Sequence, residues 1–335
     1  MANQFLKSGK VKDVYTANGD LQFKFSDRIS AFDKVIPTEI PNKGETLART
    51  SAYWFEAVRG LGIPTHYLGL DSPDTMRVRP VRVIHDYSQL THTTTDYLIP
   101  LEFISRRFVY GSAWSRLRRG ELTPQQLGFP ATYEIKEGER LPHPFYEVTT
   151  KLEAFDRPLT REETLAISGL TEKEYNESWE IVQAVDDEIG RRIKGLVHVD
   201  GKKELAMDRD RRLMLVDTFG TADEDRFWDA EEHKQGRYVE KSKEHVRQHY
   251  QRNGYYDLLR RSREKDEDGR PKLTLEDPEV MEFYRNQRLS KMLTESRFRG
   301  ETEPPIPPLK AAQVVIISNL YVQLLEQLTG QKFRG

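Results

Sequence analysis

The sequence predicts an α+β fold in which strands dominate the first hundred residues and helices dominate the last third. Residues 21–25 alternate between apolar and polar side chains as a half-buried strand does, whereas residues 46–62 and 304–330 carry apolar side chains at helical spacing. A chain of 335 residues is too long for one small core and suits two or three packed subdomains. We expect a strand-rich unit over residues 1–98, a central α+β unit over 99–240 and a helical segment over 241–335.

The composition is typical of a soluble, globular, cytoplasmic protein. Charged residues make up 32% of the chain and balance to a net charge of −2, so nothing indicates wholesale binding to nucleic acid or to a membrane. The absence of cysteine excludes disulfides, thiolate metal sites and a cysteine nucleophile. Residues 1–20 lack an apolar signal core, and the longest apolar run, residues 314–317, is far shorter than the roughly 20 residues of a membrane span.

In the first half of the chain, the helix expected over residues 46–62 ends at Gly60 and Gly62. Residues 77–87 and 96–114 return to strand character. Residues 124–158 are rich in Pro and Gly and weakly periodic, which predicts a long loop. We expect its 140–156 portion to be mobile and to become ordered when substrates bind.

In the second half, Thr171 and Glu174 form a capping box that predicts the start of a helix. Most charges of residues 229–303 are expected on a solvated helical face. The final amphipathic helix begins after prolines and closes at Gly330. No internal repeat is evident.

Two strand-like runs, residues 199–207 and 212–219, flank a polar turn and predict a hairpin. With a turn near residues 209–211, Glu204 faces Asp217, and Asp200, Lys202 and Glu204 share one face. Opposed carboxylates repel unless a cation lies between them, and carboxylate oxygens with substrate phosphates are the ligands that Mg²⁺ prefers. In the alternative, the register is shifted by one residue and these charges face water.

The stretch KSGKVKDVYTANGDLQFKFSD, residues 7–27, places two lysines side by side on an expected strand. Lys10 and Lys12 could lie on a solvated edge strand, where lysines discourage pairing with another sheet. They could instead neutralise a phosphate that the backbone approaches at Gly9. On these residues alone the edge strand is the more ordinary interpretation.

Other basic residues lie at positions suited to anions. Arg106 follows an apolar strand and precedes a Gly111–Ser112 corner, and Lys243 and Arg247 are spaced to share a helical face. The loop after the hairpin combines acids and a base with two aromatic residues: Asp217, Asp223, Asp225, Arg226, Phe227 and Trp228.

Eight blocks, in order, resemble the family of phosphoribosylaminoimidazole-succinocarboxamide synthase, or SAICAR synthetase. They are SGKVKDVY, SDRISAFD, IPNKGETL, EFISRRFVYGS, LPHPFYEVTTK, VDGKKEL, VDTFGTADEDRFWD and the tail from PPLKAAQVV to LYVQLLEQLTG. The resemblance covers almost the whole chain, with extra material near residues 258–300. It implies an ATP-dependent ligase that joins L-aspartate to the carboxylate of carboxyaminoimidazole ribotide (CAIR), through an acyl phosphate, in purine biosynthesis.

The resemblance also implies the site. The substrates would be ATP, CAIR and L-aspartate, with Mg²⁺ as the metal and the first subdomain clamping ATP; a monomer and an oligomer are both compatible with the sequence. The catalytic residues implied are Lys202, Glu204, Asp217 and Arg226, with Glu204 and Asp217 binding Mg²⁺. Nucleotide-binding positions are Gly9, Lys10, Lys12, Glu102 and Lys151, and Lys151 and Asp156 match a loop that closes over the ligands. Substrate-binding positions are Ser30, Asp33, Arg106, Ser112, Asp200, Arg226, Lys243 and Arg247.

The chain departs from the family pattern at several positions. Gly201 replaces a usual phenylalanine, Thr218 a usual glutamate and Phe155 a usual histidine, while Glu244 follows Lys243 where glutamine is usual. Residues 221–228, TADEDRFW, replace the usual TPDSSRFW. These changes bear on substrate affinity and on the identity of the acceptor amine.

Two other functions are weighed against this one. Residues 217–220, DTFG, loosely resemble the metal-binding Asp-Phe-Gly of kinases, but no His-Arg-Asp catalytic loop accompanies them. The basic, tyrosine-containing residues 241–261 could stack RNA bases, although interleaved acids and the balanced net charge argue against this.

Overall fold

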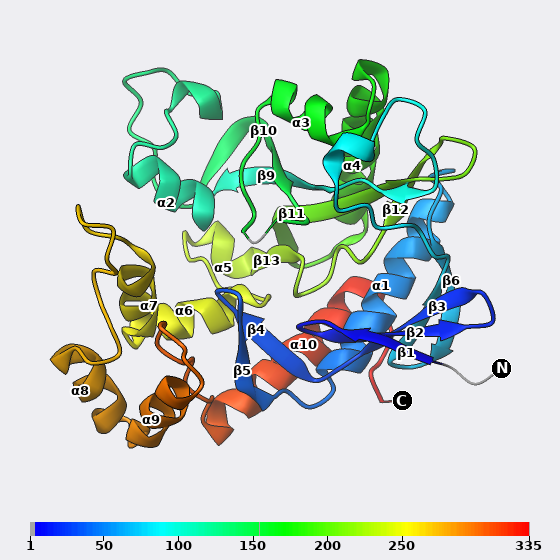
Figure 1. Ribbon diagram of the computed structural model, residues 1–335. Coiled ribbons are helices and arrows are strands. Elements are labelled where there is room, and N and C mark those ends of the chain that lie inside the picture. Colours follow the sequence, from blue (N-terminus) through cyan, green and yellow to red (C-terminus); the bar gives the residue numbers. More distant parts are fainter. Residues whose placement is uncertain (1–3, 154, 335) are drawn as a thin grey trace.

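The computed structural model describes residues 4–153 and 155–334, and its N-terminal part is built on a five-stranded antiparallel sheet (Figure 1). The strands, in the order β1-β2-β3-β7-β6, are β1 (Gln4–Ser8), β2 (Lys12–Ala17), β3 (Asp20–Phe25), β7 (Thr75–Val78) and β6 (Tyr67–Ser72). A separate hairpin of β4 (Arg28–Ala31) and β5 (Lys34–Glu39) follows β3. Helix α1 (Lys43–Arg59) contacts β3, β6 and β7, so it covers one face of this sheet.

The central part is a second antiparallel sheet, in the order β10-β9-β11-β12, with β8 and β13 also paired to β11. Its strands are β8 (Tyr97–Leu98), β9 (Leu101–Val109), β10 (Glu139–Thr150), β11 (Leu196–Met207), β12 (Leu213–Val216) and β13 (Asp225–Asp229). The accompanying helices are α2 (Ser112–Arg118), α3 (Arg161–Ser168) and α4 (Glu172–Arg192), with short 3₁₀ turns at Tyr87–Gln89 and Gln125–Leu127. Helix α4 contacts β9 and β11, where Trp179 meets Phe103 edge to face.

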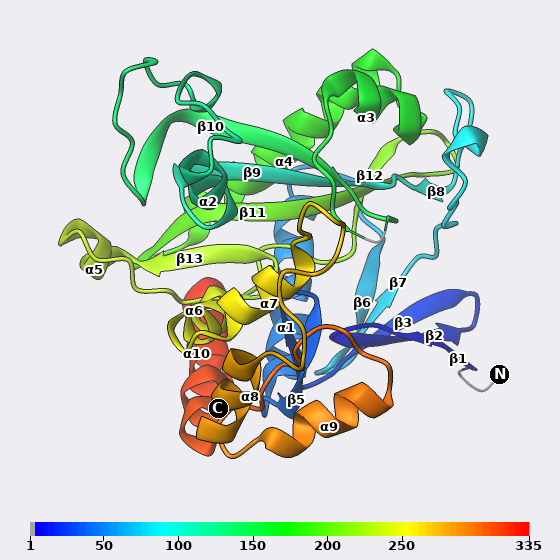
Figure 2. The ribbon, with the colours of Figure 1, turned by 60° about the vertical axis from the view of Figure 1, so that its left-hand side comes forward.

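The C-terminal part is helical. It comprises α5 (Ala230–Lys234), α6 (Glu244–Arg252), α7 (Tyr255–Arg263), α8 (Pro278–Asn286), α9 (Ser290–Phe298) and α10 (Ala311–Thr329). Helix α10 lies beside α1, so the end of the chain packs against its beginning (Figures 1 and 2). In the described residues, no helix is both long and apolar enough to cross a membrane.

The predicted α+β class is confirmed, and so are several element boundaries. The capping box of Thr171 and Glu174 starts α4, and Gly330, at a φ of 71°, ends α10. Helix α1 spans most of the predicted helix and ends at Gly60, although it begins three residues earlier, at Lys43.

The long loop predicted over residues 124–158 is wrong, because it contains the 12-residue strand β10. This strand is the outer neighbour of β9, and its pairing is irregular between Arg140 and Phe145, where Pro142 and Pro144 lie. Prolines are tolerated on an edge strand and at a bulge, so they did not signal a loop here. The mobile segment expected over residues 140–156 is therefore wrong up to Thr150.

The predicted hairpin forms, but its register is shifted by one residue. Glu204 pairs with Val216, and Asp217 lies just beyond the end of β12. Asp217 has a φ of 60°, in the left-handed region, so the backbone turns sharply at this carboxylate.

The charged segment of residues 229–303 is not simply a solvated face. Tyr250, Tyr255 and Tyr284 are buried, and their hydroxyls donate hydrogen bonds to the carbonyls of Pro307, Pro304 and Pro305, respectively. Residues 304–308 lie outside helices and strands, so these carbonyls are available to accept from side chains. The three bonds fasten the proline-rich segment 304–308 to the helices.

Candidate active site

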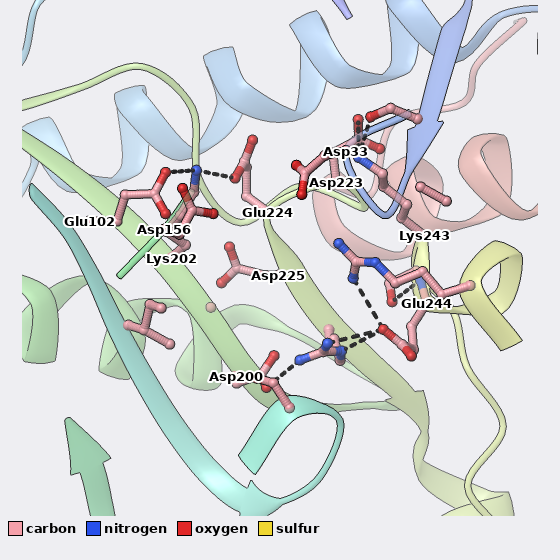
Figure 3. Close-up of a pocket in the computed structure, with 18 of the residues that line it drawn as sticks. Asp33, Glu102, Asp156, Asp200, Lys202, Asp223, Glu224, Asp225, Lys243 and Glu244 are labelled. Carbon is pink, nitrogen blue, oxygen red and sulfur yellow. Dashed lines mark hydrogen bonds and ion pairs between the residues drawn. The ribbon is translucent and has the colours of Figure 1, made fainter. Parts of the chain in front are cut away.

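A cleft of about 560 Å³ lies among the central sheet, the β4–β5 hairpin and helix α6, a size in the range of small-molecule sites (Figure 3). It collects most of the residues singled out from the sequence. Those that line it are Lys10, Ser30, Asp33, Glu102, Arg106, Ser112, Lys151, Asp156, Asp200, Lys202, Arg226, Lys243 and Arg247. Four predicted residues lie outside this lining: Gly9, Lys12, Glu204 and Asp217. Lys12, Glu204 and Asp217 are nevertheless joined to the lining residue Lys151 by a network of ion pairs.

Lysine 151 lies between the two predicted metal-binding carboxylates. Its Nζ is 2.5 Å from Glu204 Oε2 and 4.0 Å from Asp217 Oδ2. The contact with Glu204 is an ion pair rather than an aligned hydrogen bond, so within the described residues the buried Oε2 accepts no hydrogen bond. The two carboxylates thus converge on one cation despite the shifted register, and the alternative in which these charges merely face water is wrong.

The two lysines of the opening stretch take different partners. Lys10, in the turn between β1 and β2, donates to Asp33 Oδ1 at 2.7 Å. Lys12 points inward from β2, where it donates to Asp217 Oδ1, and burial lowers its pKa to about 8. Strand β1 is an edge strand, but the solvated interpretation is wrong for Lys12, whose side chain is only 18% exposed.

Lysine 202 joins three carboxylates. Its Nζ lies 2.8 Å from Glu102, 3.1 Å from Glu204 and 3.3 Å from Glu224. Burial acts to lower the pKa of Lys202, but the three carboxylates outweigh it and hold this pKa well above its usual value. Burial likewise acts to raise the pKa of Glu204, yet Lys151 and Lys202 bring it down to about 2.

Asp200 joins two arginines from different strands. Its Oδ2 lies 3.1 Å from Arg106 on β9 and 2.6 Å from Arg226 on β13. Arg106 also donates to Ser112 Oγ at 3.0 Å, so the two residues predicted to receive an anion lie side by side. Burial acts to raise the pKa of Asp200, but Arg226 and Arg106 overcome this and lower it.

Lys243 and Arg247 form the third basic group of the cleft, with Lys243 capping α6 and Arg247 one turn along it. Lys243 Nζ lies 3.3 Å from Ser30 Oγ and 3.7 Å from Asp223. The Asp223 carboxylate is also 2.9 Å from the buried Lys43 and accepts a hydrogen bond from Tyr321 of α10. The last helix therefore reaches the wall of the cleft.

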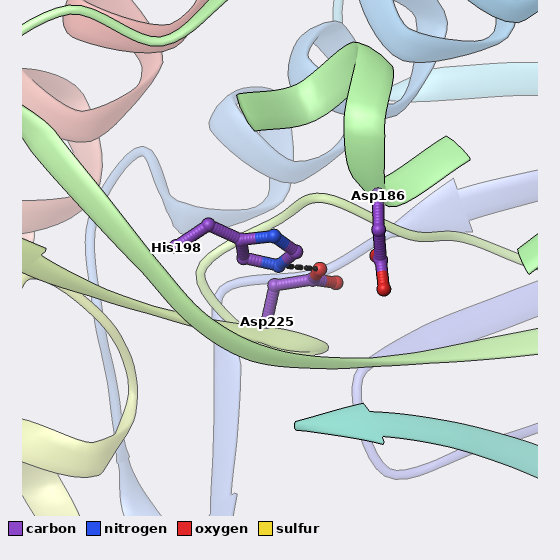
Figure 4. A group of neighbouring side chains, drawn as sticks. All are labelled: Asp186, His198 and Asp225. Carbon is purple, nitrogen blue, oxygen red and sulfur yellow. Dashed lines mark hydrogen bonds and ion pairs between the residues drawn. The ribbon is translucent and has the colours of Figure 1, made fainter. Parts of the chain in front are cut away.

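A buried charged cluster adjoins the cleft, because Asp225 belongs both to the cluster and to the cleft lining (Figure 4). His198 Nε2 is 2.7 Å from Asp225 Oδ2, and Lys203 Nζ lies 3.0 Å from Asp225 and 2.5 Å from Asp186. Histidine and two aspartates are metal-ligand types, but the Lys203 ammonium already pairs with both carboxylates.

Two departures from the family pattern meet at this cluster. Gly201 on β11 pairs with Asp225 on β13, and a Cβ at residue 201 would overlap the Asp225 carboxylate. Glycine at position 201 therefore leaves the space that the Asp225 carboxylate occupies.

Several residues that line the cleft or contact its lining were given no role from the sequence: Lys43, Glu147, Asp223, Glu224, Glu244 and Tyr321. Glu147 lies on β10, in the segment interpreted as a loop, and it accepts from Arg106 at 2.7 Å. Lys43, Asp223, Glu224 and Glu244 stand within or beside recognised blocks, which was a usable signal. Tyr321 lies almost one hundred residues from its partner and gave none.

Comparisons with known proteins show the family of this chain. The family model for SAICAR synthetase matches residues 5–262. A curated relative from Thermoplasma volcanium, phosphoribosylaminoimidazole-succinocarboxamide synthase, is 43% identical over 332 residues, which is 98% of this chain and 100% of the relative.

Solved structures establish the same fold. A SAICAR synthase from Saccharomyces cerevisiae, complexed with SAICAR, aligns with a TM-score of 0.65 at 19% identity, over 99% of this chain and 97% of that one. A SAICAR synthetase in complex with ADP aligns with a TM-score of 0.55 at 22% identity, over 88% and 98%. The chain therefore belongs to the SAICAR synthetase family, the ATP-dependent ligases of purine biosynthesis that join L-aspartate to CAIR.

Proposed function

We propose that the cleft carries out this ligation with ATP on the side of Lys10 and Lys12 and with CAIR on the side of Arg106 and Arg226. The observation that carries the proposal is the convergence of Glu204 and Asp217 on one cation at the border between the two sides. ADP in a related structure supports a nucleotide in this fold.

On the nucleotide side, the structure favours different roles for the predicted residues. Lys10 is half exposed at the cleft, so its ammonium is available to the phosphates, and Gly9 keeps this turn narrow by donating its N–H to the Lys12 carbonyl. Lys12 is buried and holds Asp217 in place. Glu102 and Lys151 line the cleft beside Lys202 and complete the nucleotide side.

The residues present fit a magnesium ion. Glu204 and Asp217 offer oxygen ligands, and the Lys151 ammonium stands where a cation is required. When bound, Mg²⁺ would neutralise the phosphate charge that develops during transfer. Lys151 would then turn from the carboxylates to the nucleotide.

On the other side, Arg106, Ser112, Arg226, Lys243 and Arg247 would hold the phosphate and carboxylate of CAIR. Asp200 would fix the two arginines in position through its contacts at 3.1 and 2.6 Å. Ser30 and Asp33, on the opposite wall, would receive L-aspartate.

The reaction would then proceed in two displacements. A carboxylate oxygen of CAIR attacks the γ-phosphorus, the bond to the β-phosphate oxygen breaks, and an acyl phosphate and ADP result. The ammonium of L-aspartate next loses a proton, and the resulting amine attacks the acyl carbon. The bond from that carbon to the phosphate oxygen breaks, inorganic phosphate leaves, and the new amide nitrogen gives up a second proton to solvent. Lys202, held by three carboxylates, would stabilise negative charge on the transferred group.

The alternative functions have less support. Tyr250 and Tyr255 of the proposed RNA-stacking segment are buried in the core, so they cannot stack bases. A kinase would stop at the first displacement, whereas the family reaction requires the second. We also propose that the enzyme works in the cytoplasm, because its substrates are soluble metabolites.

An oxygen-transfer experiment tests this function. CAIR labelled with ¹⁸O in its carboxylate should give ADP release that depends on both CAIR and L-aspartate, with one label appearing in the inorganic phosphate. Release of ADP without L-aspartate-dependent product would support the kinase, and unlabelled phosphate would contradict the acyl phosphate.

A further inference from the structure

A strained two-residue turn forms one wall of the cleft. Phe32 and Asp33 connect β4 to β5 between the paired residues Ala31 and Lys34, and their φ angles are 54° and 66°. Such hairpin turns favour Asn-Gly, because both positions require positive φ. Phenylalanine in this region is a steric outlier, so surrounding contacts must hold the turn.

Those contacts come from the C-terminal helical part, more than two hundred residues away. The Phe32 ring stacks on Tyr256 of α7 with ring centroids 4.5 Å apart and planes 30° apart. Arg263 Nη2, at the end of the same helix, donates to the Phe32 carbonyl at 3.1 Å. One partner thus holds the side chain of Phe32 and the other holds its backbone.

Glu303 completes this arrangement, which we name the α7 clamp: Tyr256, Arg263 and Glu303. Arg263 approaches both Glu303 oxygens, at 3.0 and 3.2 Å, and such paired contacts fix the guanidinium plane. Glu303 also lies 3.0 Å from Lys34, the residue that follows the turn. The clamp therefore grips the turn at its first residue and just past its last.

The clamp residues are held in place by contacts that do not involve the turn. Tyr255, beside Tyr256, is buried and donates to the Pro304 carbonyl at 2.9 Å, next to Glu303. Leu259, in the middle of α7, is fully buried. Helix α7 and the segment that carries Glu303 are thus fastened to one another independently of the turn.

On the cleft side, the turn presents a carboxylate. Asp33 accepts from Lys10 at 2.7 Å and retains a side-chain exposure of 61%, so it remains accessible to a ligand. Asp156 also lines the cleft. Among the three substrates only L-aspartate carries a cationic group, and the Asp33 carboxylate suits an ammonium.

We propose that the α7 clamp is a positioning device for L-aspartate, which holds the strained Phe32–Asp33 turn so that Asp33 receives the substrate ammonium. This inference rests on the proposed function of the cleft. It gives the C-terminal helical segment a role in substrate recognition, although none of the three clamp residues lines the cleft.

Steady-state kinetics with each substrate varied in turn test the proposal. Tyr256→Leu and Arg263→Met should each raise KM for L-aspartate about tenfold or more, while KM for ATP and CAIR and kcat stay within about twofold. Tyr256→Phe keeps the ring and should behave as the wild type. Arg260→Met is the matched control, because Arg260 lies on α7 but pairs with Asp257 and Glu264.

A double-mutant cycle distinguishes loss of the clamp from a general loss of structure. Phe32→Asn removes the stacked ring and supplies a residue that tolerates positive φ. In that background Tyr256→Leu should change KM for L-aspartate by less than about twofold. Equal rises in all three KM values, additive effects in the cycle, or the same effect from Arg260→Met would overturn the clamp. A wild-type enzyme without L-aspartate-dependent ADP release would instead contradict the function of the cleft.

Discussion

Three acidic residues near the reaction centre pair with basic residues from distant parts of the chain. Asp217 pairs with Lys12, Glu204 with Lys151, and Asp223 with Lys43. The sequence blocks named most of these acids and bases, because their chemistry suits phosphates and metal ions. The pairing could not be predicted, since each pair joins residues 53 to 205 positions apart that only the packed sheets bring together.

Histidine 66 should make stability depend on pH. It is 3% exposed, and burial, followed by the charge of Lys12, lowers its pKa from 6.5 to about 3. The folded state therefore binds this proton less readily than the unfolded state, so stability is full above pH 6.5 and falls as the pH drops towards 3.

The measurement compares unfolding free energies of the wild type and His66→Gln between pH 7.5 and 5. Below pH 6.5 the wild type should lose stability relative to the variant by up to about 1.4 kcal/mol per pH unit. His92→Gln, at an exposed histidine, is the control. Parallel curves for the wild type and His66→Gln would show that His66 charges freely in the folded protein.

Lysine 203 should be essential to the buried cluster beside the cleft. Lys203→Met removes the cation that lies 2.5 Å from Asp186 and 3.0 Å from Asp225. Two uncompensated buried carboxylates should cost about 3–5 kcal/mol of unfolding free energy at pH 7. Denaturant unfolding measures this loss, and Lys194→Met, at an exposed lysine, is the control. A loss below about 1 kcal/mol would contradict a charged cluster.

Among the elements, amphipathic helices were predicted well and irregular edge strands were not. Helices α1, α4 and α10 combine apolar periodicity with capping residues or a terminal glycine, and these local signals survive in the fold. Strand β10 carries prolines and breaks its pairing, so its identity depends on β9, a partner that local sequence does not reveal. The register of the hairpin was predicted wrongly for the same reason, because the sequence of one strand does not specify which residue of its partner it faces.

Hydrogen exchange should differ between the two parts of residues 140–156, the segment that the sequence predicted to be a mobile loop. Amides of Val148–Thr150 pair with β9 and should exchange slowly with or without ligands. Peptides covering Lys151–Glu153 and Phe155–Arg157 should become more protected when ATP, Mg²⁺ and CAIR are added, because Lys151 would change partners. Equal exchange of the second group with and without ligands would contradict movement of Lys151.

Helix α6 should govern the affinity for CAIR. Lys243→Ala and Arg247→Ala should each weaken the binding of CAIR by about 1.5–3 kcal/mol, seen as a much larger rise in KM for CAIR than for ATP. Arg252→Ala tests general effects of charge loss, since Arg252 lies at the exposed end of the same helix. Equal rises in KM for CAIR and for ATP would show that Lys243 and Arg247 do not bind CAIR specifically.

At the scale of the whole molecule, the site depends on folding the two ends of the chain around the central sheet. The N-terminal hairpins supply Lys10, Lys12 and Asp33, and the central sheet supplies Glu204 and Arg226. Helix α6 forms part of the remaining wall, and Tyr321 of α10 contacts the lining residue Asp223 from outside the lining. The class, the family and most cleft residues could be predicted, because the ordered blocks carry them. The role of the helical segment beyond α6 could not, because its contacts with the Phe32–Asp33 turn exist only in three dimensions.

The central claim is that Glu204 and Asp217 hold one divalent cation together with the nucleotide. Mn²⁺ binding in the presence of ATP, followed by the paramagnetic relaxation of water protons, tests it most directly. Glu204→Gln and Asp217→Asn should remain folded and lose Mn²⁺ affinity by about tenfold or more, whereas Thr218→Ala, at the neighbouring buried hydroxyl, should bind as the wild type does. Full Mn²⁺ affinity in both acid variants, with loss in the Thr218 variant, would contradict the site.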